Sequence, residues 1–114
     1  EGTLSLAKSI VGMQKLEYLK LDLCSNDIYD EGVLWLAGAL RYLAENLKFL
    51  TLNLESNHIG DIGAIDLATA LSEQRNLETL RLYVGYNEID YKGEGALSDA
   101  FKSIKMKASR LYLY

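Results

Sequence analysis

The sequence repeats one pattern of leucines three times at a nearly constant spacing. Each copy has the form Leu-x-x-Leu-x-Leu-x-Leu, with valine as the last residue of the third copy, and continues after two residues as Asn-x-Ile-x-x-x-Gly. The asparagines are Asn26, Asn57 and Asn87, so the copies lie 31 and then 30 residues apart. This periodicity indicates a solenoid, because one such unit cannot bury its apolar face alone.

Two shorter periodicities alternate within each copy. Leucines alternate with polar or aromatic residues over positions 19–23, 50–54 and 80–84, which predicts strands with one buried face. From each glycine onward, apolar residues recur at every fourth position, which predicts an amphipathic helix. We therefore expect an α/β fold, namely a right-handed α/β horseshoe in which a parallel sheet lines the concave side and the helices form the convex side.

The whole chain of 114 residues fits one array of such units. We divide it into a partial repeat over 1–15, full repeats over 16–46, 47–76 and 77–107, and a truncated repeat over 108–114. In the truncated repeat, Ala108, Leu111 and Leu113 take the first three leucine positions. The chain thus begins at a helix and stops inside a strand.

Both ends of the chain carry apolar residues where a solenoid normally has a polar cap. These residues are Leu4, Leu6 and Ile10 at the start and Leu111 and Leu113 at the end. We therefore expect the chain to be a fragment of a longer array. In the alternative arrangement, copies of the chain associate end to end through their uncapped repeats.

The composition narrows the range of functions. A single cysteine, Cys24, and the lack of an Asn-x-Ser/Thr site favour a cytoplasmic, intracellular protein over a secreted one. The net charge of −4 disfavours a nucleic-acid partner, and no run approaches the roughly 18 apolar residues of a membrane span. The one histidine, His58, lies in a turn a full repeat away from Cys24, and no metal-ligand or phosphate-loop spacing occurs, so we expect no enzyme activity, cofactor or metal.

The Asn-x-Ile-x-x-x-Gly segment followed by a leucine-rich helix resembles, over the whole chain, the ribonuclease-inhibitor-like subclass of leucine-rich repeat proteins. This resemblance implies an intracellular α/β horseshoe that binds other proteins. An extra Leu-x pair in each strand lengthens the repeats here to 30–31 residues. Because this departs from the better-known members, no binding residue is carried over from them.

The candidate contact residues lie between the strand leucines, because stacked repeats align equivalent positions in columns about 4.8 Å apart. One column is Lys20, Thr51, Arg81 and Tyr112, a second is Asp22, Asn53, Tyr83 and Tyr114, Glu55 belongs to a third nearer the turn, and Tyr18, Phe49 and Thr79 flank them at the strand start. Tyrosine and arginine are enriched at binding hot spots, which favours the region around Arg81 and Tyr83. Tyrosine also suits exposed strand positions through its β-propensity alone.

These features predict a protein–protein interaction scaffold whose partner binds the concave sheet face. Two alternatives remain open: an accessory or regulatory array of a larger signalling protein, such as a kinase or a GTPase activator, and a self-stacking structural module. The turns after the strands are acidic, with Asp27, Asp30, Asp61 and Glu88 among their residues. Such carboxylates either attract a basic partner or interact favourably with the helix dipoles.

Overall fold

The computed structural model describes residues 2–104 and 108–113, with the backbone alone for residues 108–110. Helices alternate with strands along the described chain. The elements are α1 (Gly2–Val11), β1 (Tyr18–Asp22), α2 (Tyr29–Tyr42), β2 (Phe49–Asn53), α3 (Asp61–Ser72), β3 (Thr79–Tyr83), α4 (Tyr91–Ser103) and β4 (Ala108–Tyr112). The predicted strands and helices are confirmed, although the helices α2, α3 and α4 begin two or three residues before their glycines.

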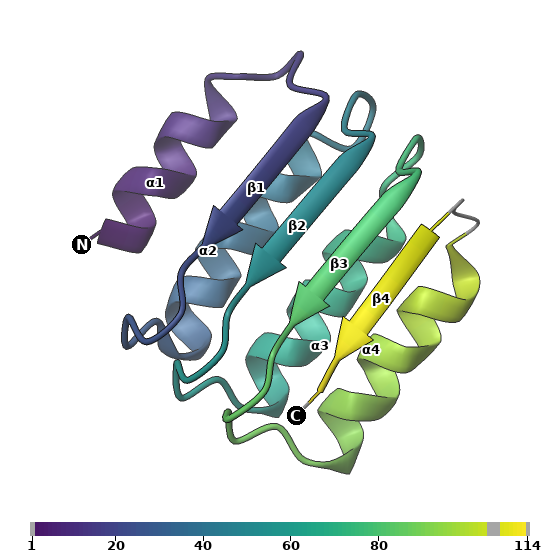
Figure 1. Cartoon of the computed structure of the whole chain (residues 1–114). Coiled ribbons are helices and arrows are strands. Elements are labelled where there is room, and N and C mark those ends of the chain that lie inside the picture. Colours follow the sequence, from purple (N-terminus) through teal and green to yellow (C-terminus); the bar gives the residue numbers. More distant parts are fainter. Residues whose placement is uncertain (1, 105–107, 114) are drawn as a thin grey trace.

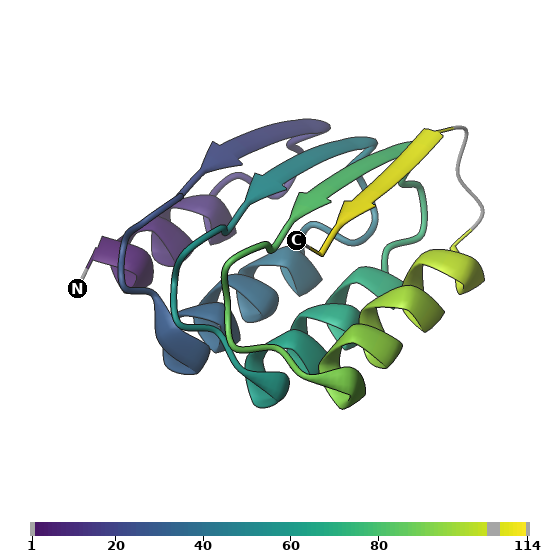
Figure 2. The same cartoon turned by 60° about the horizontal axis from the view of Figure 1, so that its bottom comes forward.

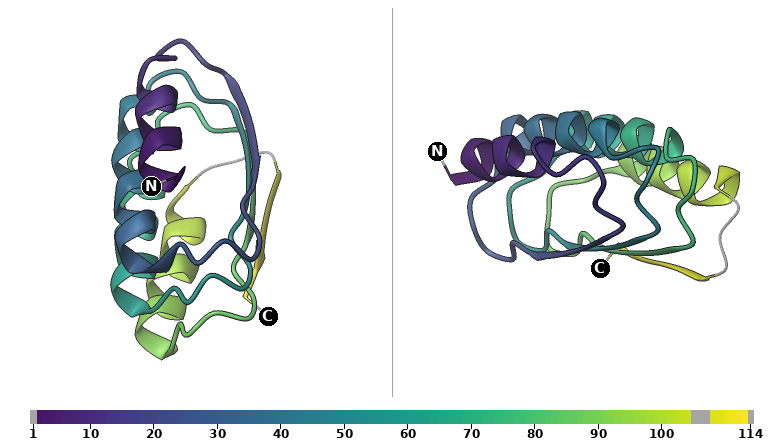
Figure 3. Two further views of the ribbon diagram at one scale, coloured as in Figure 1. Left: turned by 90° about the vertical axis from the view of Figure 1, so that its left-hand side faces the viewer. Right: turned by 90° about the horizontal axis from the view of Figure 1, so that it is seen from above.

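The strands form one parallel sheet in the order β1-β2-β3-β4, and the helices lie together on one of its faces (Figure 1). Figures 2 and 3 show the two layers from other sides, with the helices in one layer and the strands in the other. In Figure 1 the strands descend in front, the helices return behind, and each unit moves one place to the right, so the crossovers are right-handed. We call the face that the described helices leave uncovered the open sheet face.

The strand leucines fill the space between the two layers. Leu50, Leu52 and Leu54 are at most 1% exposed, and they share one buried cluster with Leu36 and Leu40 of α2. Burial of each such side chain is worth roughly 1.5–3 kcal/mol relative to its exposed state. The apolar cluster therefore holds the sheet to the helices across the repeats.

The start of the chain is better covered than the sequence predicted. The expectation that Ile10 is exposed is wrong, because α1 packs against α2 and leaves Ile10 only 2% exposed. Leu4 and Leu6 on the same helix are half-buried, and so are Leu111 and Leu113 near the other end of the described chain.

The last strand aligns two residues away from its predicted position. Leu82 pairs with Leu111 and Tyr83 with Tyr112, so the predicted alignment of Tyr112 with Arg81 is wrong. The step from β3 to β4 is 29 residues, where the sequence pattern had suggested 31. A shift of two residues keeps every leucine on the same face of the sheet, which is why the apolar pattern alone did not reveal it.

The repeat asparagines form the predicted ladder through the turns after the strands. Asn57 is fully buried, and its Oδ1 accepts backbone N–H groups from Asn26 and Ile28 at 2.7 and 3.3 Å. Its Nδ2 donates to the backbone oxygen of Leu23 at 2.9 Å. Asn87 bonds in the same way to the turn that contains Asn57. Each asparagine therefore ties its own repeat to the one before it.

A second set of bonds joins the helix starts of successive repeats. The Oδ1 atom of Asp30 in α2 accepts the backbone N–H groups of Gly60 and Gly63 at the start of α3, at 2.7 and 3.1 Å. Asp61 in α3 makes the equivalent pair of bonds to the start of α4, at 2.8 and 3.0 Å. These two carboxylates therefore cap the helix of the next repeat, as N-terminal capping groups do within one helix.

We expect replacement of Asp30 by alanine to lower the free energy of unfolding by about 1–2 kcal/mol, because two helix-start N–H groups lose their acceptor. Glu31→Ala is the matched control, since Glu31 is the next residue, is exposed, and has no side-chain hydrogen bond among the described residues. Its loss is expected to cost no more than about 0.5 kcal/mol. Urea unfolding followed by circular dichroism measures both values, and equal losses would contradict the capping role.

The helices α2 and α3 are also joined by a charged contact on their outer side. Arg41 donates from Nε to Glu73 at 3.0 Å and from Nη2 to Asp66 at 3.2 Å. Partial burial acts to lower the pKa of Arg41, but the hydrogen bonds and charges of Asp66 and Glu73 outweigh this effect and raise the pKa above its ordinary value. The guanidinium therefore remains charged at every pH at which the protein is folded.

Candidate functional site

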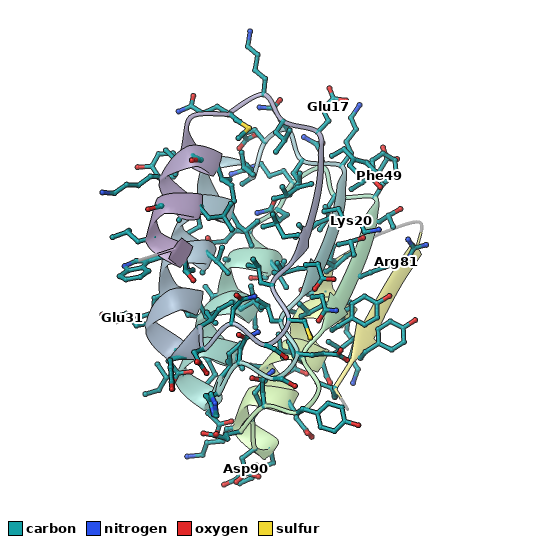
Figure 4. The ribbon with its side chains drawn as sticks, turned by 60° about the vertical axis from the view of Figure 1, so that its left-hand side comes forward. Glu17, Lys20, Glu31, Phe49, Arg81 and Asp90 are labelled. Carbon is teal, nitrogen blue, oxygen red and sulfur yellow. The ribbon has the colours of Figure 1, made fainter. Side chains whose placement is uncertain are left out.

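The open sheet face carries its side chains in columns that cross the strands. The sheet register places Lys20 beside Thr51 and Thr51 beside Arg81, which confirms that these predicted candidates share a column. We call these three residues the basic column. Figure 4 shows Lys20, Phe49 and Arg81 on the side of the sheet that faces away from the helices. The side chains predicted to be exposed therefore lie together on one surface.

A hollow of about 270 Å³ lies on this surface. Six of the predicted contact residues line it together with Tyr18 and Leu21, namely Lys20, Asp22, Thr51, Asn53, Arg81 and Tyr83. Sites for small molecules usually enclose roughly 300–1,000 Å³ and are mostly apolar. This smaller and more polar hollow suits side chains of a docked protein better than a free ligand.

The two cations of the basic column are available for binding. Lys20 and Arg81 are exposed, and within the described residues no carboxylate lies within ion-pair distance of either. The hydroxyl of Thr51 lies between them in the column and has no hydrogen bond to a described residue. A partner group therefore meets cationic and hydroxyl donors that are not already occupied.

The polar residues of the next column are held by the turns that follow them. Asp22 accepts the backbone N–H of Cys24 at 3.2 Å, and Asn53 accepts that of Glu55 at 3.0 Å. Each bond engages the Oδ1 atom and fixes the direction of the side chain. The second oxygen of Asp22 and the amide nitrogen of Asn53 make no hydrogen bond to a described residue, so they remain for an external group.

Aromatic pairs lie on both sides of the basic column. The rings of Tyr83 and Tyr112 are stacked, with centroids 4.4 Å apart and an interplanar angle of 3°. At the strand start, the rings of Tyr18 and Phe49 lie 5.7 Å apart, and these two side chains are 63% and 38% exposed. Exposed aromatic rings beside unpaired cations are the combination found at binding hot spots.

The remaining predicted residues lie at the edge of this arrangement. Glu55 is half-buried after β2 and does not line the hollow. Tyr112 joins the surface through Tyr83 and not, as predicted, through Arg81. Tyr114 lies outside the described residues, as does the predicted repeat boundary at residue 107.

The acidic turns serve the fold more than a binding site. Asp30 and Asp61 are engaged in the helix caps described above. His58 lies 3.4 Å from a carboxylate oxygen of Asp27 and 3.1 Å from one of Glu88, and its ring stacks on Tyr29 at 5.2 Å. The dipole interpretation accounts for the two caps, but the side-chain bonds between repeats could not be read from the sequence.

Backbone conformation in these turns is a feature that the sequence did not predict. Several residues other than glycine have positive φ angles of 51–60°, and they are Ser25, Asp27, Tyr29, Ser56, His58 and Tyr86. Such angles are uncommon for residues with a side chain. The asparagine ladder holds this turn shape in each repeat, and the turn in turn fixes the end of the open sheet face.

These observations define the protein as an α/β repeat scaffold with an exposed sheet face. Over residues 45–68 the chain matches the family model described as Leucine Rich repeat. The matched segment contains β2, its turn and the first part of α3, and the match supports a leucine-rich repeat protein. Repeats of this kind generally mediate protein–protein interaction and are typically not enzymes.

No curated protein matches the chain. Among the described residues, no helix has both the length and the apolar character needed to cross a membrane.

Proposed function

We propose that the protein is a cytoplasmic interaction scaffold of the ribonuclease-inhibitor-like type, which binds a partner protein on its open sheet face. The observation that carries the proposal is the hollow lined by six of the predicted contact residues. The sheet holds these side chains on a rigid backbone, so binding orders little additional chain. The same face serves whether the array acts alone or as the regulatory part of a larger signalling protein.

The spacing of the elements supports a horseshoe with this face on its concave side. Neighbouring strands lie about 4.8 Å apart, whereas packed helices need about 8–10 Å between their axes. A continued array therefore curves toward the strands. The exposed thiol of Cys24, which has no disulfide partner, supports a reducing compartment.

A capture experiment with paired variants tests the proposed face. The immobilised chain is compared with Arg81→Ala/Tyr83→Ala on the open sheet face and with Leu34→Ala/Tyr42→Ala on the helix face, where both replaced side chains are exposed. We expect proteins retained by the wild type to bind the first variant at least about tenfold more weakly, a loss of roughly 1.4 kcal/mol, and the second variant unchanged.

Circular dichroism confirms that both variants are folded before the comparison. Retention that survives the sheet-face substitutions but fails after the helix-face substitutions would move the binding surface to the convex side. Retention that is insensitive to both pairs would contradict the proposed function.

A further inference from the structure

The basic column differs in charge from the rest of this acidic protein. We propose that Lys20, Thr51 and Arg81 bind a single aspartate or glutamate side chain of the partner protein, within an extended segment whose flanking residues are apolar. The proposal rests on the function proposed above and specifies the chemistry of the partner at that same face.

The charge state of the column supports an anionic partner group. Elsewhere, Arg41, Lys48 and Arg75 each have a carboxylate oxygen within 2.7–3.7 Å. No described carboxylate does the same for Lys20 or Arg81. A partner carboxylate would therefore pair with cations that need not first give up an internal partner.

The geometry of the column fits one carboxylate. Lys20 and Arg81 stand two strands apart, which is about 9–10 Å at the usual strand spacing. A carboxylate placed over Thr51 lies between them and accepts from the threonine hydroxyl, while the long cationic side chains reach it from both sides. Arginine is suited to this role because its guanidinium can donate two parallel hydrogen bonds to one carboxylate. The backbone register places Arg110 next in the same column.

The neighbouring columns indicate what should flank the acid. Tyr18 and Phe49 lie two residues before the basic column along their strands, and Tyr83 and Tyr112 lie two residues after it. In an extended partner segment aligned with the strands, alternate side chains are spaced by the same distance, roughly 6.6 Å. The expected pattern in the partner is therefore apolar-x-acid-x-apolar, with the acid a single Asp or Glu.

A longer run of negative charge does not fit the same surface. Asp22 lies on the open sheet face beside the basic column, Glu55 follows β2, and the turns beyond them contain further carboxylates. These groups lie within or close to the Debye length of about 8 Å at physiological ionic strength. They repel a polyanion such as a nucleic acid, but a lone carboxylate seated on the basic column keeps its distance from most of them.

Selection from a random peptide library displayed on phage tests the inference, because the library samples every short sequence pattern and requires no purified partner. We expect enrichment of peptides with one Asp or Glu between apolar residues. Fluorescence polarisation then compares an enriched peptide with its Glu→Gln or Asp→Asn counterpart, and we expect at least about a tenfold loss of affinity, together with weaker binding at higher salt.

Substitutions in the protein identify the site. Arg81→Gln should weaken binding of the acidic peptide, whereas Lys8→Gln on the helix face should not. Arg81→Glu should weaken it further, and a peptide in which lysine replaces the acid should bind Arg81→Glu better than it binds the wild type. This reversal of preference distinguishes a direct charge contact from a loss of folding.

The outcomes separate this inference from the function on which it rests. Enriched peptides without an acid that still lose binding on Tyr83→Ala would overturn the carboxylate site and support the open sheet face. Failure to enrich any peptide, or peptides insensitive to every sheet-face substitution, would count against both.

Discussion

Replacement of Asn57 by alanine is expected to lower the free energy of unfolding by about 3–5 kcal/mol, a large part of the roughly 5–15 kcal/mol that stabilises a typical domain. The fully buried Asn57 side chain serves two backbone donors and two backbone acceptors in adjacent repeats. Alanine leaves these four groups without that partner, and each costs roughly 1–3 kcal/mol where water cannot reach it. Urea unfolding followed by circular dichroism and tryptophan fluorescence measures the change.

Asn46→Ala provides the matched control for this experiment. Asn46 also donates from its side chain to a backbone oxygen of the preceding repeat, that of Gln14 at 2.9 Å, but it is exposed. Water replaces this bond, so we expect a loss of no more than about 1 kcal/mol. If the two alanine variants were equally stable, the ladder would not be a main source of stability.

Gly93→Ala and Gly95→Ala are expected to change stability in opposite directions although both lie in α4. A methyl group on Gly93 would lie 2.7 Å from Oδ1 of Asp61 and 3.0 Å from Cβ of Ala64, both in α3. The helices must separate or the Asp61 cap must break, so we expect a loss of about 2–4 kcal/mol. A methyl group on Gly95 meets no atom within 4 Å, and alanine should stabilise the exposed helix position by about 0.4–1 kcal/mol.

Thermal and urea unfolding of the two variants give this comparison directly. The same chemical change two residues apart removes helix propensity as an explanation for a difference in sign. A Gly93→Ala protein as stable as the wild type would show that α3 and α4 can separate at little cost, and would contradict the role assigned to this glycine.

The leucine pattern was sufficient to predict the first three strands and their alignment, because a repeat at fixed spacing fixes which positions become neighbours. It failed at β4, where Ala108 was assigned to a leucine position and the spacing to the preceding strand is shorter. The alternation of inward and outward residues has period two, so it cannot distinguish alignments that differ by two residues. Pairing of Tyr112 with Tyr83 therefore had to come from the structure.

The candidate site was predictable in its membership but not in its internal contacts. Strand alternation alone assigns Lys20, Thr51 and Arg81 to one face. It does not determine that Asp22 and Asn53 are held by the turns that follow them, because those bonds depend on backbone angles beyond the strands. Nor does the leucine pattern indicate that Asp30 bonds to the next repeat, since its partners are backbone groups about 30 residues away.

The register has a consequence for how such an array can diverge in evolution. From the first alternating leucine of a strand to the helix glycine the interval is constant, at 19 to 32, 50 to 63 and 80 to 93. From that glycine to the equivalent position of the next strand it shortens, at 32 to 50, 63 to 80 and 93 to 109. Insertions and deletions are thus absorbed after the helix start, on the return to the sheet, while the asparagine ladder and the exposed columns keep their alignment. Repeats of unequal length can therefore be exchanged or added without moving the residues that meet a partner.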